Sequence, residues 1–102
     1  MKGKLVRDKI PEIIEKNDKR KPRTRILALK EFELELRKKL IEEASEASKA
    51  RRSSLAEELA DIEEIIDALC KLHNFTRSSI TKIQQTKRVK RGAFKKRIFL
   101  IN

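Results

Sequence analysis

Four acidic residues in the middle of the chain stand in two pairs whose spacing suits a metal site. Glu43 and Glu46 form one pair, and Glu58 and Asp61 form the other. Residues three apart on an α-helix lie on one face about one turn apart, so each pair can direct its carboxylate oxygens at one ion. The stretch that contains both pairs is KLIEEASEASKARRSSLAEELAD, residues 39–61. The spacing predicts two facing helices that bring this acidic quartet together.

The position of the quartet on these helices supports the same interpretation. At about 100° per residue, Glu43 falls inside the apolar stripe of the first helix and Glu46 lies at its edge. Glu58 and Asp61 take the same places on the second helix. The stripe residues are Leu29, Phe32, Leu36, Leu40, Ala44 and Ala47 on the first helix, and Leu55, Leu59, Ile62, Ile65, Ile66 and Leu69 on the second. Packing stripe against stripe is expected to gather the four carboxylates in a half-buried pocket.

Such a pocket requires a compensating charge, because each unpaired buried carboxylate costs on the order of several kcal/mol. Hard divalent cations suit an all-oxygen ligand set, Mg²⁺ above all, and Mg²⁺ held by carboxylates usually keeps positions for water and phosphate oxygens. The quartet therefore predicts chemistry on a phosphate ester or anhydride. The alternative interpretation is that these residues are solvated charges on amphipathic helices, as most helical glutamates are.

The remaining sequence predicts an all-α fold of antiparallel helices with short extended ends. Ser53 or Ser54 is the expected N-cap of the second long helix, with Glu57 completing a capping box after Ser54. The tail from residue 93 is expected to form a short strand or a docked extended segment. The predicted order is an extended segment over 4–10, a short helix over 11–15, a loop over 17–24, and long helices over about 25–50, 55–73 and 76–90.

The first long helix is expected to have a second, weaker apolar face. Ile26, Leu27, Leu34 and Ile41 lie away from the main stripe. Two apolar faces on one helix indicate a neighbour beyond the single chain, such as a partner subunit. We therefore expect a homo-oligomer, a dimer or a tetramer.

The composition bounds the function further. The 102 residues are expected to form one domain, and their net charge of +11 predicts attraction to nucleotide phosphates or nucleic acid. A single cysteine excludes an internal disulfide and a multi-cysteine zinc site, and two glycines exclude a glycine-rich phosphate loop. Neither a membrane span nor a signal peptide is recognisable, so a cytoplasmic protein without membrane contact is expected.

The order of these residues resembles the metal-binding motif of the MazG-like all-α nucleoside triphosphate pyrophosphohydrolases, a superfamily that includes the phosphoribosyl-ATP pyrophosphohydrolases. The opening KLVRDKIPEIIEKN and the closing KRGAFKKRIFL are similar to one small house-cleaning branch of it. Many members of that branch have two glycines where this chain has Gly92 and Ala93. The resemblance covers nearly the whole chain. It implies an oligomeric helical enzyme that uses Mg²⁺ or Mn²⁺ to hydrolyse a canonical or non-canonical nucleoside triphosphate to the monophosphate and pyrophosphate.

The resemblance also implies roles for individual residues. The quartet Glu43, Glu46, Glu58 and Asp61 corresponds to the metal ligands, with one or two ions. Glu42 and Glu43 are the expected catalytic residues, Glu42 as a motif member that holds a water. The expected contacts to substrate phosphates are basic residues of the two end segments: Lys4, Arg7, Lys9, Lys87, Arg91 and Lys95.

Two other functions remain open at the level of sequence. A small basic helical nucleic-acid-binding protein fits the charge and the cluster KRVKR over 87–91. The scarcity of aromatic residues, four phenylalanines in all, counts against single-strand binding. A family member that binds nucleotides without hydrolysing them is the second alternative.

Overall fold

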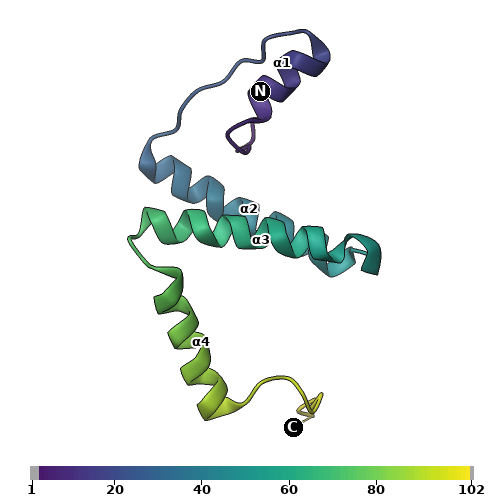
Figure 1. Ribbon diagram of the computed structural model, residues 1–102, viewed down its shortest axis with the longest axis vertical. Helices are drawn as coiled ribbons and strands as arrows, with labels where there is room; N and C mark the ends of the chain where they lie inside the picture. The colour runs from purple at the N-terminus through teal and green to yellow at the C-terminus, as the bar shows by residue number, and fades with distance from the viewer. Residues whose placement is uncertain (1–2, 102) are drawn as a thin grey trace. The chain divides into compact units, whose positions relative to one another are not determined.

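The computed structural model describes residues 3–101, and within them all regular structure is helical. Two compact units divide the chain, one up to Leu69 and one from Cys70 onward. The purely helical regular structure of the described residues confirms the predicted all-α class. The helices, marked in Figure 1, are α1 (Ile10–Asp18), α2 (Leu29–Lys49), α3 (Arg52–Leu72) and α4 (Arg77–Arg91).

The first unit is organised by α2 and α3, which lie side by side (Figure 1). Residues 50 and 51 alone separate them, and so short a link makes consecutive helices antiparallel neighbours. Their apolar stripes meet at Leu36 and Ile65, which are 4% and 6% exposed. The stripe prediction is confirmed at its centre. Its ends are less covered than expected, since Leu29, Leu55 and Leu59 remain exposed.

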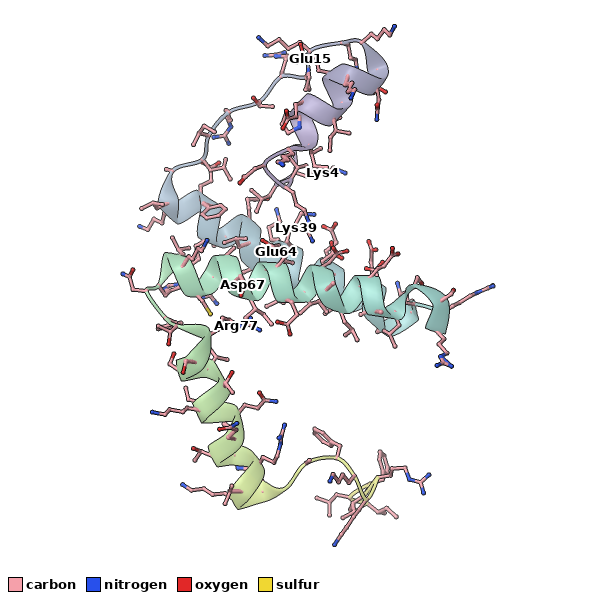
Figure 2. The ribbon with its side chains drawn as sticks, in the orientation of Figure 1. Lys4, Glu15, Lys39, Glu64, Asp67 and Arg77 are labelled. Carbon is pink, nitrogen blue, oxygen red and sulfur yellow. The ribbon has the colours of Figure 1, made fainter. Side chains whose placement is uncertain are left out.

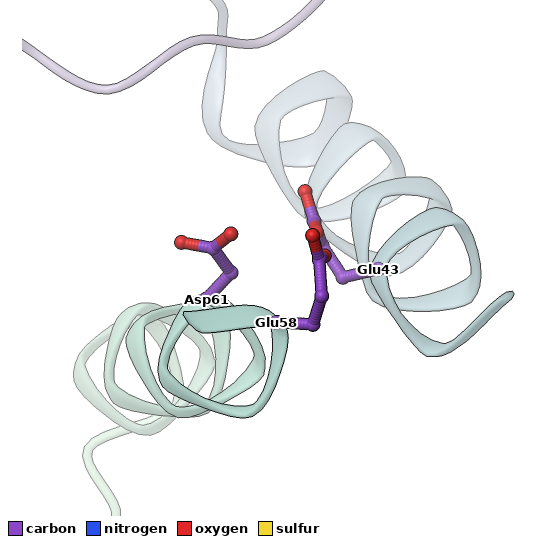
Figure 3. A group of neighbouring side chains, drawn as sticks. All are labelled: Glu43, Glu58 and Asp61. Atoms are coloured by element: carbon purple, nitrogen blue, oxygen red, sulfur yellow. The ribbon is translucent and has the colours of Figure 1, made fainter. Parts of the chain in front are cut away.

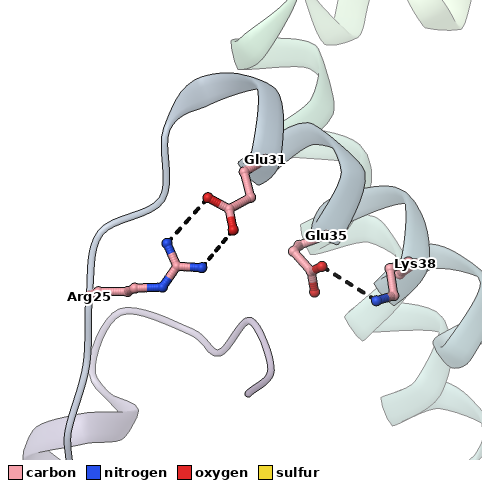
Figure 4. A network of polar contacts seen from close by, with 4 residues as sticks. All are labelled: Arg25, Glu31, Glu35 and Lys38. Atoms are coloured by element: carbon pink, nitrogen blue, oxygen red, sulfur yellow. Dashed lines mark hydrogen bonds and ion pairs between the residues drawn. The ribbon is translucent and has the colours of Figure 1, made fainter. Parts of the chain in front are cut away.

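The N-terminus of α2 lies later in the chain than the sequence pattern predicted. The helix begins at Leu29 rather than near Arg25, and Ala28 before it has extended dihedrals (φ −64°, ψ 155°). The Arg25 guanidinium donates two hydrogen bonds to the Glu31 carboxylate, at 3.2 and 2.6 Å (Figure 4). This bidentate pair holds residues 25–28 against the first helical turn, where the acidic Glu31 also suits the helix dipole.

The predicted capping box of α3 is wrong, because the helix begins before both serines. The helix begins at Arg52, so Ser53 and Ser54 lie inside the first turn. The Ser54 hydroxyl donates to the Arg51 carbonyl at 3.3 Å, and the backbone N–H of Leu55 donates to the same carbonyl at 2.9 Å. The helix α3 therefore begins three residues before the predicted start at Leu55.

The short helix α1 and the segment before it complete the first unit. Pro11 stands in the first turn, as predicted, where its missing N–H costs nothing. The helix continues to Asp18, three residues beyond the predicted end, and Lys19 closes it in the left-handed region at φ 54°.

The second unit consists of the end of α3, α4 and the tail. Thr76 is the N-cap of α4, and its hydroxyl accepts a hydrogen bond from the Ser79 N–H at 3.0 Å. Gly92 ends the helix with φ 85°, a backbone conformation that favours glycine. The prediction of a short C-terminal strand or a docked extended segment is wrong within the described residues. Residues 93–101 have no strand, and all of them are exposed. No described helix is long and apolar enough to cross a membrane.

Candidate metal centre

Three members of the acidic quartet meet between α2 and α3. Glu43 extends from α2, and Glu58 and Asp61 extend from one side of α3 (Figure 3). One carboxylate oxygen from each residue lies within 4.8 Å of one from each of the others, and all three residues are half-buried. Helical spacing places Glu58 and Asp61 one turn apart, and the packing of α2 beside α3 brings Glu43 opposite them (Figure 3). We call this group the acidic trio.

Glu58 is the member with the least favourable surroundings. Its Oε2 atom is shielded from solvent and has no hydrogen-bond partner among the described residues. Removal of water raises the pKa of the Glu58 carboxyl, and the negative charges of Glu46 and Glu43 raise this pKa further. Such an oxygen is stabilised either by a proton or by a cation.

The fourth member of the quartet lies near the trio without belonging to it. Glu46 is exposed on α2, and its charge contributes to the raised pKa of Glu58. Glu42, the predicted catalytic neighbour, is also exposed, and its Oε1 lies 3.7 Å from the Lys39 Nζ. The structure therefore gathers three of the four predicted ligands and leaves Glu46 and Glu42 at the margin of the site.

Arg7 supplies a positive charge to this site from the N-terminal segment. Its Nη2 donates a hydrogen bond to Asp61 Oδ1 at 2.8 Å, and its Nη1 lies 3.9 Å from Glu64 Oε1. The helix position of Glu64 is labelled in Figure 2. Arg7 was expected to contact substrate phosphates, and here it pairs with an expected metal ligand. Arg7 and Asp61 are 54 positions apart in the sequence, so no periodic spacing predicts this pair.

The other predicted phosphate contacts are distributed over the two units. Lys4 and Lys9 are exposed in the first unit, and Lys4 is labelled on the N-terminal segment in Figure 2. Lys87, Arg91 and Lys95 are exposed in the second unit. Of the six predicted phosphate contacts, Arg7 is the one that forms an ion pair with the acidic trio, through Asp61.

The chemistry of the trio fits a hard divalent cation. The three residues offer only carboxylate oxygens, the ligand type that Mg²⁺ and Mn²⁺ prefer. The shielded and unpartnered oxygen of Glu58 lacks a positive partner, and the neighbouring arginine pairs with Asp61 instead. All three residues are half-buried, so the trio is partly exposed to solvent.

The raised pKa of Glu58 predicts a stability that falls with rising pH in chelator. The folded chain retains this proton to higher pH than the unfolded chain, whose carboxyl titrates near 4.5. The free energy of unfolding should thus decrease as pH rises from that value through the raised pKa, and stay lowered above it. Urea unfolding across this range measures the effect. In Glu58→Gln the corresponding part of the decrease should be absent, and profiles of equal slope for both proteins would contradict the assignment.

No known protein family matches the chain, and no curated protein or solved structure is similar to it.

Proposed function

We propose that the chain is a metal-dependent nucleoside triphosphate pyrophosphohydrolase of the MazG-like type. The observation that carries this proposal is the trio of facing carboxylates between α2 and α3, with a shielded Glu58 oxygen that lacks a hydrogen-bond partner. A structural cluster of this kind destabilises the metal-free fold, so its presence is best explained by a cation that binds there. The family resemblance of the end segments and of the motif order supports the reaction class.

Within this proposal the residues of the site have distinct roles. Glu43, Glu58 and Asp61 bind the cation, and Glu46 approaches from the margin through a change of side-chain rotamer. A Mg²⁺ or Mn²⁺ ion at this place supplies charge stabilisation for triphosphate oxygens and activates a water. Glu42 lies one residue from the trio, on the exposed side, where it can orient the attacking water. Lys4, Arg7 and Lys9, which belong to the same unit as the trio, neutralise the remaining phosphate charge.

The reaction class is tested by measuring pyrophosphate release from a panel of canonical and modified nucleoside triphosphates, with Mg²⁺ and with chelator. Release of pyrophosphate that requires the metal supports the proposal and ranks the substrates. Nucleotide binding without release by folded, metal-loaded protein would instead support a nucleotide-binding function. Release of inorganic phosphate without pyrophosphate would exclude the proposed cleavage to a nucleoside monophosphate and pyrophosphate.

We also propose that the protein functions as a homo-oligomer. Leu34 and Ile41 project from the side of α2 that faces away from Leu36, and they are 61% and 72% exposed. Their spacing of seven residues aligns them along one side of the helix. Ile26, at 96% exposure, adds to the apolar surface just before α2. We propose that a second copy of the chain covers this surface, because in most homo-oligomers the same surface of two identical subunits is in contact.

The Arg7 pair leads to a prediction about metal affinity. Arg7 competes with a cation for Asp61, so Arg7→Gln should bind Mn²⁺ about two- to fivefold more tightly, which is the range expected for an exposed ion pair. Titration calorimetry without nucleotide measures this change. Arg25→Gln is the matched control, because it also removes one charge and one arginine–carboxylate pair, away from the trio. Unchanged or weaker binding in Arg7→Gln alone would show that Arg7 does not compete.

A further inference from the structure

The positive charge of the chain is concentrated in its second unit. Residues 70–102 contain ten of the 27 lysine and arginine residues and none of the 16 acidic residues, so they carry +10 of the net charge of +11. Residues 1–69 are close to neutral as a result. The proposed hydrolase site lies in that neutral part, and its chemistry does not require so strong a segregation of charge.

Most of these basic residues gather where α4 ends and the tail begins. The last two turns of α4 and the tail are exposed at every position. Lys87, Arg88 and Arg91 line a surface hollow together with Phe94 and the backbone around Gly92. No acidic residue is present in the second unit to pair with them. The basic residues in question are Lys87, Arg88, Lys90, Arg91, Lys95, Lys96 and Arg97.

Two phenylalanines flank the basic run of the tail. Phe94 directly precedes Lys95–Arg97, and Phe99 follows this run after Ile98. The exposed fractions of the two phenylalanines are 98% and 87%. Exposed aromatic rings next to cationic side chains combine a stacking surface for bases with a charge that attracts phosphates. The chain has few aromatic residues, but two of its four phenylalanines lie beside its densest positive charge. Low aromatic content therefore does not count against single-strand binding at this place.

We propose that α4 and the tail form a binding surface for single-stranded nucleic acid. Phosphates are bound by the basic residues at the end of α4 and in the tail, and unstacked bases pack on Phe94 and Phe99. A single strand suits the surface better than a duplex, because the bases of a duplex are already stacked on one another. This second activity does not depend on the proposed hydrolase function.

The helix α4 by itself suits an anionic membrane surface less well than a nucleic acid. A helix that lies in the membrane interface needs a continuous apolar face. On α4 the large apolar residues are Ile80, Ile83 and Val89, and at about 100° per residue Val89 lies on the side opposite the two isoleucines. Basic residues occupy the positions around them. The helix therefore offers phosphate contacts on several sides and lacks a face to insert among acyl chains.

The proposal is tested on the full chain by fluorescence anisotropy with a labelled oligothymidylate over a salt series. A variant with Arg88, Lys90, Lys96 and Arg97 changed to Gln should lose affinity, and the slope of log K against log salt should fall by about 0.7 for each phosphate contact removed. The matched control changes Lys16, Lys19, Arg20 and Lys21 to Gln, four exposed basic residues of the first unit. An equal loss in the control would show that net charge alone drives binding and would overturn the proposal.

Metal binding provides a check on folding in the same experiment. The four changed residues lie outside the set proposed to bind substrate, so Mn²⁺ affinity and pyrophosphate release should remain those of the wild type. Their loss in this variant would contradict the independence of the two activities.

A second variant distinguishes stacking from apolar insertion. Phe94→Leu with Phe99→Leu keeps the side chains apolar and removes the rings, so affinity for the oligothymidylate should fall at least about tenfold. Binding to vesicles of anionic phospholipid should be weak in both proteins. Wild-type affinity for the oligonucleotide in this variant would overturn the stacking surface, and tight vesicle binding with no oligonucleotide binding would identify a membrane surface instead.

Discussion

Glu58→Gln is expected to abolish metal-dependent pyrophosphate release, by at least about a hundredfold. The amide keeps the shape of the side chain but loses the charge that a divalent cation requires. A bound ion contributes on the order of several kcal/mol of transition-state stabilisation, which would be lost with it. Glu57→Gln is the matched control, since Glu57 is the preceding residue on α3 and is exposed to solvent. This control should retain wild-type release. Full activity in Glu58→Gln would remove the trio from the mechanism.

The same substitution separates a metal site from a structural role. In chelator, Glu58→Gln should be as stable as the wild type or more stable. The change removes a carboxylate whose pKa is raised by burial and by the charges of Glu46 and Glu43. Added Mn²⁺ should raise the melting temperature of the wild type and leave that of the variant nearly unchanged. A variant that is both inactive and unfolded would point to structure rather than to metal binding. Glu43→Gln should behave in the same way.

The parts of the structure that the sequence predicted are those governed by local periodicity. The apolar repeats of α2 and α3 determine which side of each helix is buried, and Leu36 and Ile65 lie at the centre of that contact. Because Glu43 and Glu58 share those sides, their convergence with Asp61 followed from the same pattern. The ends of α4 are likewise set by local chemistry. The Thr76 hydroxyl caps the first turn, and Gly92 ends the helix with a positive φ.

The parts that were not predicted depend on contacts between residues far apart in the sequence, or on whether a segment finds a partner strand. The helix α2 begins at Leu29, after Arg25, and the Arg25 side chain pairs with Glu31 of the first turn, although the sequence before Leu29 is compatible with a helix. The pairing of Arg7 with Asp61 joins segments that no periodic pattern relates. The tail has the composition of a strand, but a strand needs a partner for its backbone hydrogen bonds, and the described tail has none.

The exposed apolar surface of α2 leads to the second large effect. If the chain associates as proposed, Leu34→Glu combined with Ile41→Glu should prevent this association and lower the melting temperature. Burial of a Leu or Ile side chain contributes about 2 kcal/mol, so placing two carboxylates in the same contact removes several kcal/mol from association. Sedimentation velocity measures the assembly, and thermal unfolding at two protein concentrations shows whether stability depends on association.

The control for this variant is a carboxylate on an exposed helix position away from the apolar surface. Ala56→Glu meets this condition, because Ala56 is exposed on the side of α3 opposite Ile65. It should leave both the sedimentation coefficient and the melting temperature near their wild-type values. Since Leu34 and Ile41 are already exposed in the single chain, their substitution costs almost nothing unless a partner covers them. A wild-type protein that sediments as one chain, with a melting temperature unaffected by the two substitutions, would therefore exclude the oligomer directly.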